Sequence, residues 1–349
     1  MHCLVATPHR LGIREMAERV GQEWENLGHD VDYRLGKGAA ARIGPFTVGV
    51  LGIARWWDRL LHELAKNPTA YDIIWTHQPI APRIPTTDAE FWRRILITYH
   101  TTFRREYQLA RSGVYPRRQA PYYWVTQTLE CWFHRRINRL ALRPEYTVVS
   151  PHLRDELKPY GVSIVTHIPN GVFTPTGQFE RIRGTYDIPE DAILVLNVGS
   201  HTPQKRPVAF ANYLSEACDE DTYCVMVGDG PLTDEVRRAA GDRVIVIGAV
   251  SEEEKWRWFA EADVFSSLSA YEGMPVATME ALSFGLPVIL SDIPAHRSLF
   301  EDYDVPGSIV PDDPAAIHRS IKETYGIRAS VSLPTWQDVA AGYIELMDV

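Results

Sequence analysis

Two features of the sequence predict an α/β protein built from two doubly wound domains. Short apolar runs of strand length alternate with helix-like segments in both halves of the chain, which favours parallel sheets with right-handed crossovers. The length of 349 residues suffices for two domains of ordinary size. Because such sheets bind ligands beyond the carboxyl ends of their strands, we expect a binding cleft between the two domains.

The first half contains six predicted strands and two clear helices. The strands are expected at 3–7, 31–35, 71–76, 95–100, 147–150 and 164–168, and the helices at 13–27 and 122–142. Segment 174–189 is rich in Gly, Pro and Thr and is interpreted as a linker.

The second half shows the alternation more clearly. Its strands are expected at 193–198, 223–227, 244–247, 264–268 and 288–291, with helices between them. A capped amphipathic helix is predicted at 335–347, near the end of the chain.

The composition is that of a globular protein, with 45% hydrophobic and 23% charged residues. The chain has neither a signal-like opening nor an apolar run that could span a bilayer. Its four cysteines are scattered, without the spacing of a metal site or a redox pair. These features predict a reduced, metal-free protein of the cytoplasm, with no cofactor and no nucleic-acid partner.

One segment departs from the acidic balance of the chain, whose formal net charge is −9. Residues 83–143 carry twelve Arg, no Lys and four acidic residues, a net charge of +8, together with many Trp, Tyr and Phe. Such a mixture suits an anionic membrane surface, on which the protein would be peripheral, or an anionic acceptor. It is equally typical of a solvated face whose aromatic side chains pack inward.

The stretch 271–280, YEGMPVATME, carries the strongest functional signal. A strand-like run precedes it and a helix-like run begins within it, so Glu272 is expected in a tight turn and Glu280 inside the helix. Free backbone N–H groups at the start of a helix favour a phosphate. Two carboxylates beside such a phosphate site suit the hydroxyl groups of a sugar and a ribose. Alone, the spacing is also compatible with a solvated helix face.

Together with other blocks, this stretch resembles the retaining glycosyltransferases of the GT-B fold, family four (glycosyl transferases group 1). The supporting blocks are NVGSHTPQK at 197–205, VGDGP at 227–231, VIGAVSEEEK at 246–255 and GLPVILSD at 285–292. GHDV at 28–31, Ser150-Pro151 and PNGV at 169–172 also look like the family. The resemblance implies domains at 1–172 and 173–332, with the segment 333–349 crossing back to the first domain.

The resemblance also implies roles for individual residues. Glu272 would contact the sugar hydroxyls, Glu280 the ribose, and Lys205 the departing diphosphate; His100 would line the sugar side of the cleft. Backbone N–H groups would hold sugar and diphosphate, and Gly12 would let its loop approach the phosphates. The N–H groups belong to Gly273, Met274, Val276 and Ala277. Val250 and Ser251 would lie beside the base.

The sequence departs from the family at Ser200, where an Arg often follows the glycine. A hydroxyl cannot replace a guanidinium as a phosphate ligand, so His201 or, better, Arg206 would have to compensate. The implied reaction moves a sugar, with retention and without a metal, from a UDP- or GDP-linked donor to a hydroxyl acceptor that is lipid-linked or part of a glycan. The alternatives are a non-catalytic nucleotide-sugar-binding protein and another enzyme of this fold, such as an epimerase or a phosphorylase.

Overall fold

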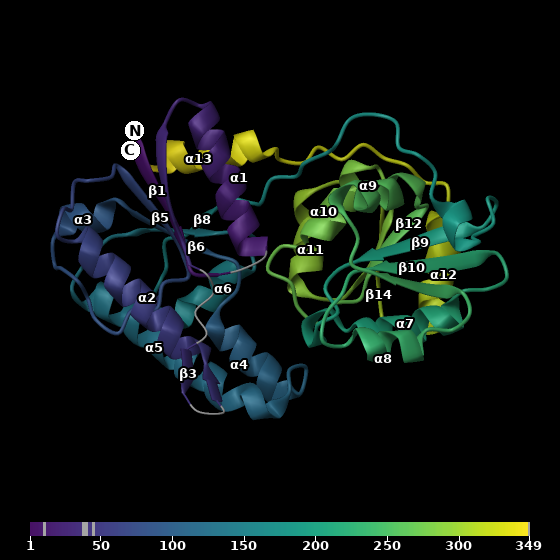
Figure 1. Ribbon diagram of the computed structural model, residues 1–349, viewed down its shortest axis with the longest axis horizontal. Helices are drawn as coiled ribbons and strands as arrows, with labels where there is room; N and C mark the ends of the chain where they lie inside the picture. Colours follow the sequence, from purple (N-terminus) through teal and green to yellow (C-terminus); the bar gives the residue numbers. More distant parts are fainter. Residues whose placement is uncertain (10–11, 37–40, 44–45, 348–349) are drawn as a thin grey trace. The chain divides into compact units, whose positions relative to one another are not determined.

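The computed structural model describes residues 1–9, 12–36, 41–43 and 46–347, and the chain forms two compact units. Unit 1 comprises Met1–Gly171 and Pro334–Val349, and unit 2 comprises Val172–Leu333 (Figure 1). The last two residues of the predicted crossing segment, 348–349, lie outside the described residues. Each unit contains one six-stranded sheet whose paired strands are all parallel, as the alternating pattern predicts.

Unit 1 has the strand order β2-β1-β5-β6-β7-β8, with β3 and β4 as a separate antiparallel pair. The strands are β1 (His2–Thr7), β2 (Asp30–Leu35), β3 (Ala41–Ile43), β4 (Phe46–Val48), β5 (Ile73–His77), β6 (Ile95–Tyr99), β7 (Glu145–Val148) and β8 (Thr166–His167). The helices are α1 (Gly12–Asn26), α2 (Gly49–Leu64), α3 (Ala89–Arg93), α4 (Phe103–Ser112), α5 (Ala120–Arg139), α6 (Leu153–Leu157) and α13 (Trp336–Met347). Two 3₁₀ turns are η1 (Arg117–Gln119) and η2 (Lys158–Tyr160).

Helix α13 packs within unit 1, although more than 160 residues separate it in sequence from the rest of that unit. It lies beside α1 (Figure 1), where the indole N–H of Trp24 donates to the carbonyl of Ala340 at 3.0 Å. Tyr343 is fully buried, with its ring 4.8 Å from the ring of Trp75 on β5. The aromatic contacts explain why the chain returns to this unit, since burying these rings removes large apolar surfaces from water.

Unit 2 has the strand order β11-β10-β9-β12-β13-β14. The strands are β9 (Ile193–Val198), β10 (Thr222–Val227), β11 (Val244–Gly248), β12 (Val264–Ser267), β13 (Val288–Ser291) and β14 (Gly307–Val310). The helices are α7 (Pro207–Ala217), α8 (Thr233–Ala239), α9 (Glu252–Glu261), α10 (Val276–Ser283), α11 (Pro294–Asp302) and α12 (Pro314–Thr324). The 3₁₀ turns are η3 (Arg183–Tyr186) and η4 (Pro203–Lys205).

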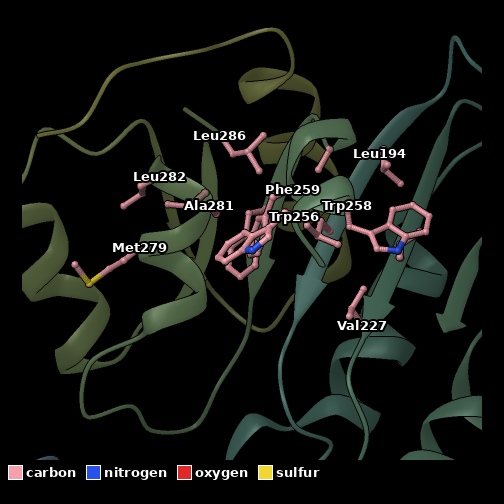
Figure 2. Packing of buried hydrophobic residues seen from close by; sticks show 14 of the residues in the cluster. Leu194, Val227, Trp256, Trp258, Phe259, Met279, Ala281, Leu282 and Leu286 are labelled. Atoms are coloured by element: carbon pink, nitrogen blue, oxygen red, sulfur yellow. The ribbon is translucent and has the colours of Figure 1, made fainter. Parts of the chain in front are cut away.

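Both faces of the unit 2 sheet are buried, and successive residues of a strand serve opposite faces. On β9, Leu194 and Leu196 join one apolar cluster, whereas Ile193 and Val195 join the other. Figure 2 shows Trp256 and Phe259 of α9 in the first cluster, together with residues of α10 and of the sheet. This packing fixes α9 and α10 against the same face of the sheet.

Segment 174–189, which the sequence predicts as a linker, is partly packed into unit 2. Ile182 and Ile188 are buried in its core. The guanidinium of Arg183, also buried, donates to the carboxylates of Glu261 at 2.9 Å and Asp263 at 3.0 Å. The linker interpretation is therefore wrong for these residues. Ile182 and Ile188 are isolated and show no strand or helix periodicity, so the sequence did not predict that they are buried.

A buried carboxyl in unit 1 leads to a testable pH dependence. Glu130 of α5 is fully buried, and its carboxyl accepts hydrogen bonds from the N–H of Phe103 at 3.0 Å and from the hydroxyl of Tyr160. Burial raises the pKa of Glu130 to about 8. The folded chain therefore keeps this proton at pH values where the unfolded chain has lost it, so the stability that the carboxyl contributes falls as the pH rises from about 4.5 to about 8.

We expect Glu130→Gln to remove this contribution to the pH dependence. The melting temperature of the variant, relative to that of the unmodified protein, should rise between about pH 5 and about pH 8. Glu63→Gln, at an exposed position on α2, is the matched control and should leave the profile unchanged. Parallel profiles for Glu130→Gln and the unmodified protein would show that Glu130 is ionised in the folded state.

Candidate functional site

The predicted turn residues of unit 2 are held together by an ion pair. Lys205 ends η4, and its ammonium Nζ lies 2.6 Å from Oε1 and 2.8 Å from Oε2 of Glu272, which is 4% exposed. The side-chain amide of Gln204 donates to the carbonyl of Tyr271 at 2.9 Å, and the N–H of Ala270 donates to the carbonyl of Gln204. The turn after β9 and the turn after β12 are thereby joined side by side.

Glu280 also has a cationic partner, which the sequence analysis did not assign. Nζ of Lys255 on α9 lies 2.9 Å from Oε1 of Glu280 on α10. The same ammonium lies 4.0 Å from the centroid of the Trp256 ring, a cation–π contact. Lys255 therefore fixes the orientation of the carboxylate of Glu280, which lies about one turn beyond the start of α10.

The start of α10 has the predicted form of a tight Gly/Pro turn that leads into a helix. Pro275 occupies the N-cap position without a side-chain cap, and the helix begins at Val276. The N–H of Val276 donates to the carbonyl of Met274 at 3.0 Å, so the proposed phosphate contact of Val276 would have to replace this bond. Gly273 precedes the helix in the same turn, and Ala277 lies in its first turn.

The loop that contains Ser200 packs against the loop after β10. The N–H of Gly199 donates to the carbonyl of Val227, and the N–H of His201 donates to the carbonyl of Asp229, both at 2.9 Å. A Cβ on Gly228, whose φ is +140°, would lie 1.9 Å from the carbonyl oxygen of Gly199. A glycine is therefore required here for the two loops to meet.

The side chains around Ser200 already have partners. The Ser200 hydroxyl lies 3.3 Å from that of Thr202. Nδ1 of the buried His201 is 2.9 Å from the hydroxyl of Thr233, and the guanidinium of Arg206 is paired with Asp312. Compensation for the missing arginine by Arg206 would require this ion pair to open.

The predicted base-side residues occupy the start of α9. Ser251 is the N-cap of this helix, and its hydroxyl accepts a hydrogen bond from the N–H of Glu254 at 3.1 Å. Val250 packs on the apolar cluster shared by α9 and α10. Val250 is therefore held by apolar packing, and Ser251 by the cap of α9.

His296 was missed by the sequence analysis, although it belongs to the same set of residues. It is fully buried near the start of α11, and its Nδ1 lies 2.8 Å from the carbonyl oxygen of Ser291. Burial lowers its pKa, while the charges of Glu272 and Lys205 act on that pKa in opposite directions. A single histidine outside the recognised motif blocks gives no sequence signal for this position.

The remaining predicted residues, Gly12 and His100, lie in unit 1. Gly12 is the first residue of α1, and a Cβ there would meet no atom within 4 Å. His100 follows β6, with its Nε2 3.1 Å from Nδ1 of the buried His77 at the end of β5. Burial, reinforced by the nearby His9, lowers the pKa of His100 to about 3, so its ring is neutral near pH 7.

In the described part of the chain, we searched for groups of metal-ligating side chains and for membrane-spanning helices. Its His, Cys, Asp and Glu side chains form no group of three or more that could hold a metal ion. Among the described helices, none is both long and apolar enough to cross a bilayer.

Comparison with known proteins identifies the family. The model for glycosyl transferases group 1 matches residues 178–326, and that for glycosyltransferase family 4 matches residues 11–174. The chain belongs to the family-four glycosyltransferases, and its two sheets have the GT-B arrangement of strands and flanking helices. Both units of the chain are covered by these models.

Two curated relatives and one solved structure are representative. The chain is 30% identical to the Escherichia coli UDP-Gal:alpha-D-GlcNAc-diphosphoundecaprenol alpha-1,3-galactosyltransferase, over 40% of this chain and 39% of that protein. It is 31% identical to the Bacillus subtilis (strain 168) protein TuaC, named as a teichuronic acid biosynthesis glycosyltransferase, over 35% of this chain and 30% of that protein. Sucrose-phosphate synthase from Thermosynechococcus elongatus superposes with a TM-score of 0.68 at 17% identity, over 99% of this chain and 98% of that chain.

The matches to these curated relatives span well under half of their length. The structural likeness, at 17% identity, shows the shared fold alone.

Proposed function

We propose that the protein is a glycosyltransferase that moves a sugar from a UDP- or GDP-linked donor to a hydroxyl acceptor, with retention of configuration and without a metal. The observation that carries the proposal is the joined pair of turns in unit 2, where Lys205 and Glu272 meet next to the start of α10. Family membership supports it. The galactosyltransferase relative is named for a UDP-linked donor and a diphosphoundecaprenol acceptor, which favours a lipid-linked acceptor here.

The proposed chemistry requires stabilisation of the departing diphosphate. Breaking the sugar–phosphate bond develops negative charge on this leaving group and positive charge on the sugar. The Lys205 ammonium and the N–H groups at the start of α10 supply positive charge to the leaving group. Glu272 accepts hydrogen bonds from Lys205 and retains lone pairs for sugar hydroxyls. Glu280, oriented by Lys255, accepts from the ribose hydroxyls.

Two further parts of the proposal concern unit 1. His100, held by His77, would contact the sugar as a neutral ring, so it would act through hydrogen bonds and not through charge. The basic, aromatic segment 83–143 would bring the protein to an anionic membrane surface as a peripheral protein of the cytoplasmic side. Exposed Trp124 and Trp132 in this segment support such contact.

A thermal-shift panel of UDP, GDP, ADP and their sugar conjugates, with and without EDTA, tests the donor site. A ligand that binds the folded chain raises its melting temperature by mass action. We expect one nucleotide family to stabilise the chain, and EDTA to leave the shift unchanged. A shift lost in EDTA would contradict metal independence. Binding without turnover of any sugar conjugate across acceptor alcohols would instead favour a non-catalytic binding protein.

We expect Glu280→Ala to raise the dissociation constant of the stabilising nucleotide by about tenfold or more, because hydrogen bonds to a charged acceptor are lost. Isothermal titration calorimetry measures the change. Glu323→Ala, which removes the same charge from an exposed position on α12, should leave the constant unchanged. An unaltered affinity in Glu280→Ala would contradict the ribose contact.

A further inference from the structure

A cavity of about 460 Å³ lies in unit 1, between α5, η2 and the start of α4. It is bordered by four arginines on two helices. These are Arg104, Arg135, Arg136 and Arg139. A second hollow shares Arg104 and adds Arg111. None of the residues proposed to bind the donor lines either of these hollows.

The arginines around this cavity differ from three other arginines of the same basic segment. The guanidinium groups of Arg83, Arg94 and Arg105 each pair with a carboxylate, those of Asp58, Asp72 and Glu156 respectively. By contrast, in the described part of the chain the four guanidinium groups at the cavity have no side-chain hydrogen bond or ion pair. Four unpaired cations around one cavity repel one another, and an anionic ligand would relieve this repulsion.

One residue that lines the cavity is anchored by hydrogen bonds within unit 1. Tyr160, which is 2% exposed, lines it, and its hydroxyl donates to the buried Glu130 and accepts from the N–H of Arg104 at 3.2 Å. Arg135 and Arg139 lie four residues apart on α5, so they share one face of the helix. The cavity therefore presents its guanidinium groups from fixed backbone positions.

The number and kind of these groups define the ligand chemistry. One or two guanidinium forks satisfy the two oxygens of a carboxylate, whereas a phosphoryl group offers three or more acceptor oxygens and a higher charge. We propose that this cavity is a binding site for a phosphoryl group, recognised by the forks of the four arginines. The inference deepens the proposed association of unit 1 with an anionic surface and rests on that part of the proposed function alone.

The surroundings favour a lipid as the source of the phosphoryl group. Trp132 borders the cavity and is 42% exposed, and Trp124, two helical turns earlier on α5, is 54% exposed. Exposed indole rings beside arginines are typical of side chains that enter the headgroup region of a bilayer. The phosphate of an anionic lipid would occupy the cavity while both indoles contact the interface.

The test uses the whole chain and two kinds of probe. Pyrophosphate is titrated by calorimetry, and vesicles of phosphatidylcholine with or without phosphatidylglycerol are used in sedimentation. The variant Arg135→Ala/Arg139→Ala removes two cavity cations, and Arg143→Ala/Arg154→Ala removes two exposed arginines elsewhere in unit 1. We expect the cavity variant to weaken both interactions by about tenfold or more, and the control by less than about twofold.

A third variant separates recognition from diffuse attraction. Arg135→Lys/Arg139→Lys keeps the charge but loses the planar fork, so pyrophosphate should bind clearly less well than to the unmodified protein. Equal losses in the cavity and control variants, or unimpaired binding by the lysine variant, would overturn the proposal in favour of diffuse charge. If the protein binds pyrophosphate but not the vesicles, the site is supported and its ligand is a soluble phosphate. If the protein binds neither probe, the proposal is overturned. The cavity variants should keep the nucleotide-induced rise in melting temperature of the unmodified protein. This control separates a failure of the cavity proposal from a failure of the donor site.

Discussion

Replacing Lys205 with alanine is expected to lower the turnover number for sugar transfer by about 100- to 1,000-fold, the range for loss of one preorganised group that stabilises transition-state charge. The departing diphosphate would lose its cation, and the buried carboxylate of Glu272 would lose the ammonium that lies 2.6 Å from it. Steady-state kinetics with a sugar nucleotide and an acceptor alcohol measure the effect.

Lys322→Ala provides the matched control for this variant. Lys322 of α12 forms an ion pair with Asp219 at 2.8 Å, in the same unit and partly exposed to solvent, so its loss should change turnover little. Lys205→Arg keeps the charge and should recover part of the lost rate. Turnover within a few-fold of normal in Lys205→Ala would show that the ammonium does not stabilise the leaving group.

Gly228→Ala is expected to destabilise unit 2 on the order of 3 kcal/mol, because the new Cβ would lie 1.9 Å from the carbonyl oxygen of Gly199 at a positive φ. The melting temperature should fall by roughly 6 to 12 °C. The two loops would be forced apart, so nucleotide binding should weaken even below the melting temperature. Calorimetric melting with and without nucleotide measures both effects.

Gly184→Ala tests whether this cost is specific to the contact between the loops. Gly184 lies in η3 of the same unit, and a Cβ there would meet no atom within 4 Å. Its substitution should shift the melting temperature little. A normal melting temperature for Gly228→Ala would mean that the two loops separate without cost.

The sequence predicted most of the parallel strands, because strands buried on both faces appear as continuous apolar runs. The run at 193–198 coincides with β9, and that at 288–291 coincides with β13. Strand β14 was missed, because its four residues begin with Gly307 at the edge of the sheet. Helix α2 was missed as well, since Gly49 and Gly52 weaken its helical pattern.

The sequence predicted which residues form the candidate site, but it did not predict which of them are in contact. Glu272 and Glu280 stood out because a strand-like run, a Gly/Pro turn and a helix surround them. Their partners did not, since Lys205 is 67 residues from Glu272 and Lys255 is 25 residues from Glu280. The first pair depends on how the turns after β9 and β12 meet, and the second on how α9 and α10 pack on the sheet. Local pattern determines neither. Local pattern likewise did not predict the contact between His77 and His100.

The central claim is that the joined turns of unit 2 form the diphosphate site. A crystal structure with the nucleotide selected by the thermal-shift panel tests it most directly. We expect the diphosphate at the start of α10, within hydrogen-bond distance of the Lys205 ammonium, and the ribose hydroxyls on Glu280. A nucleotide bound elsewhere, with the Lys205–Glu272 pair untouched, would show that these turns are not the diphosphate site.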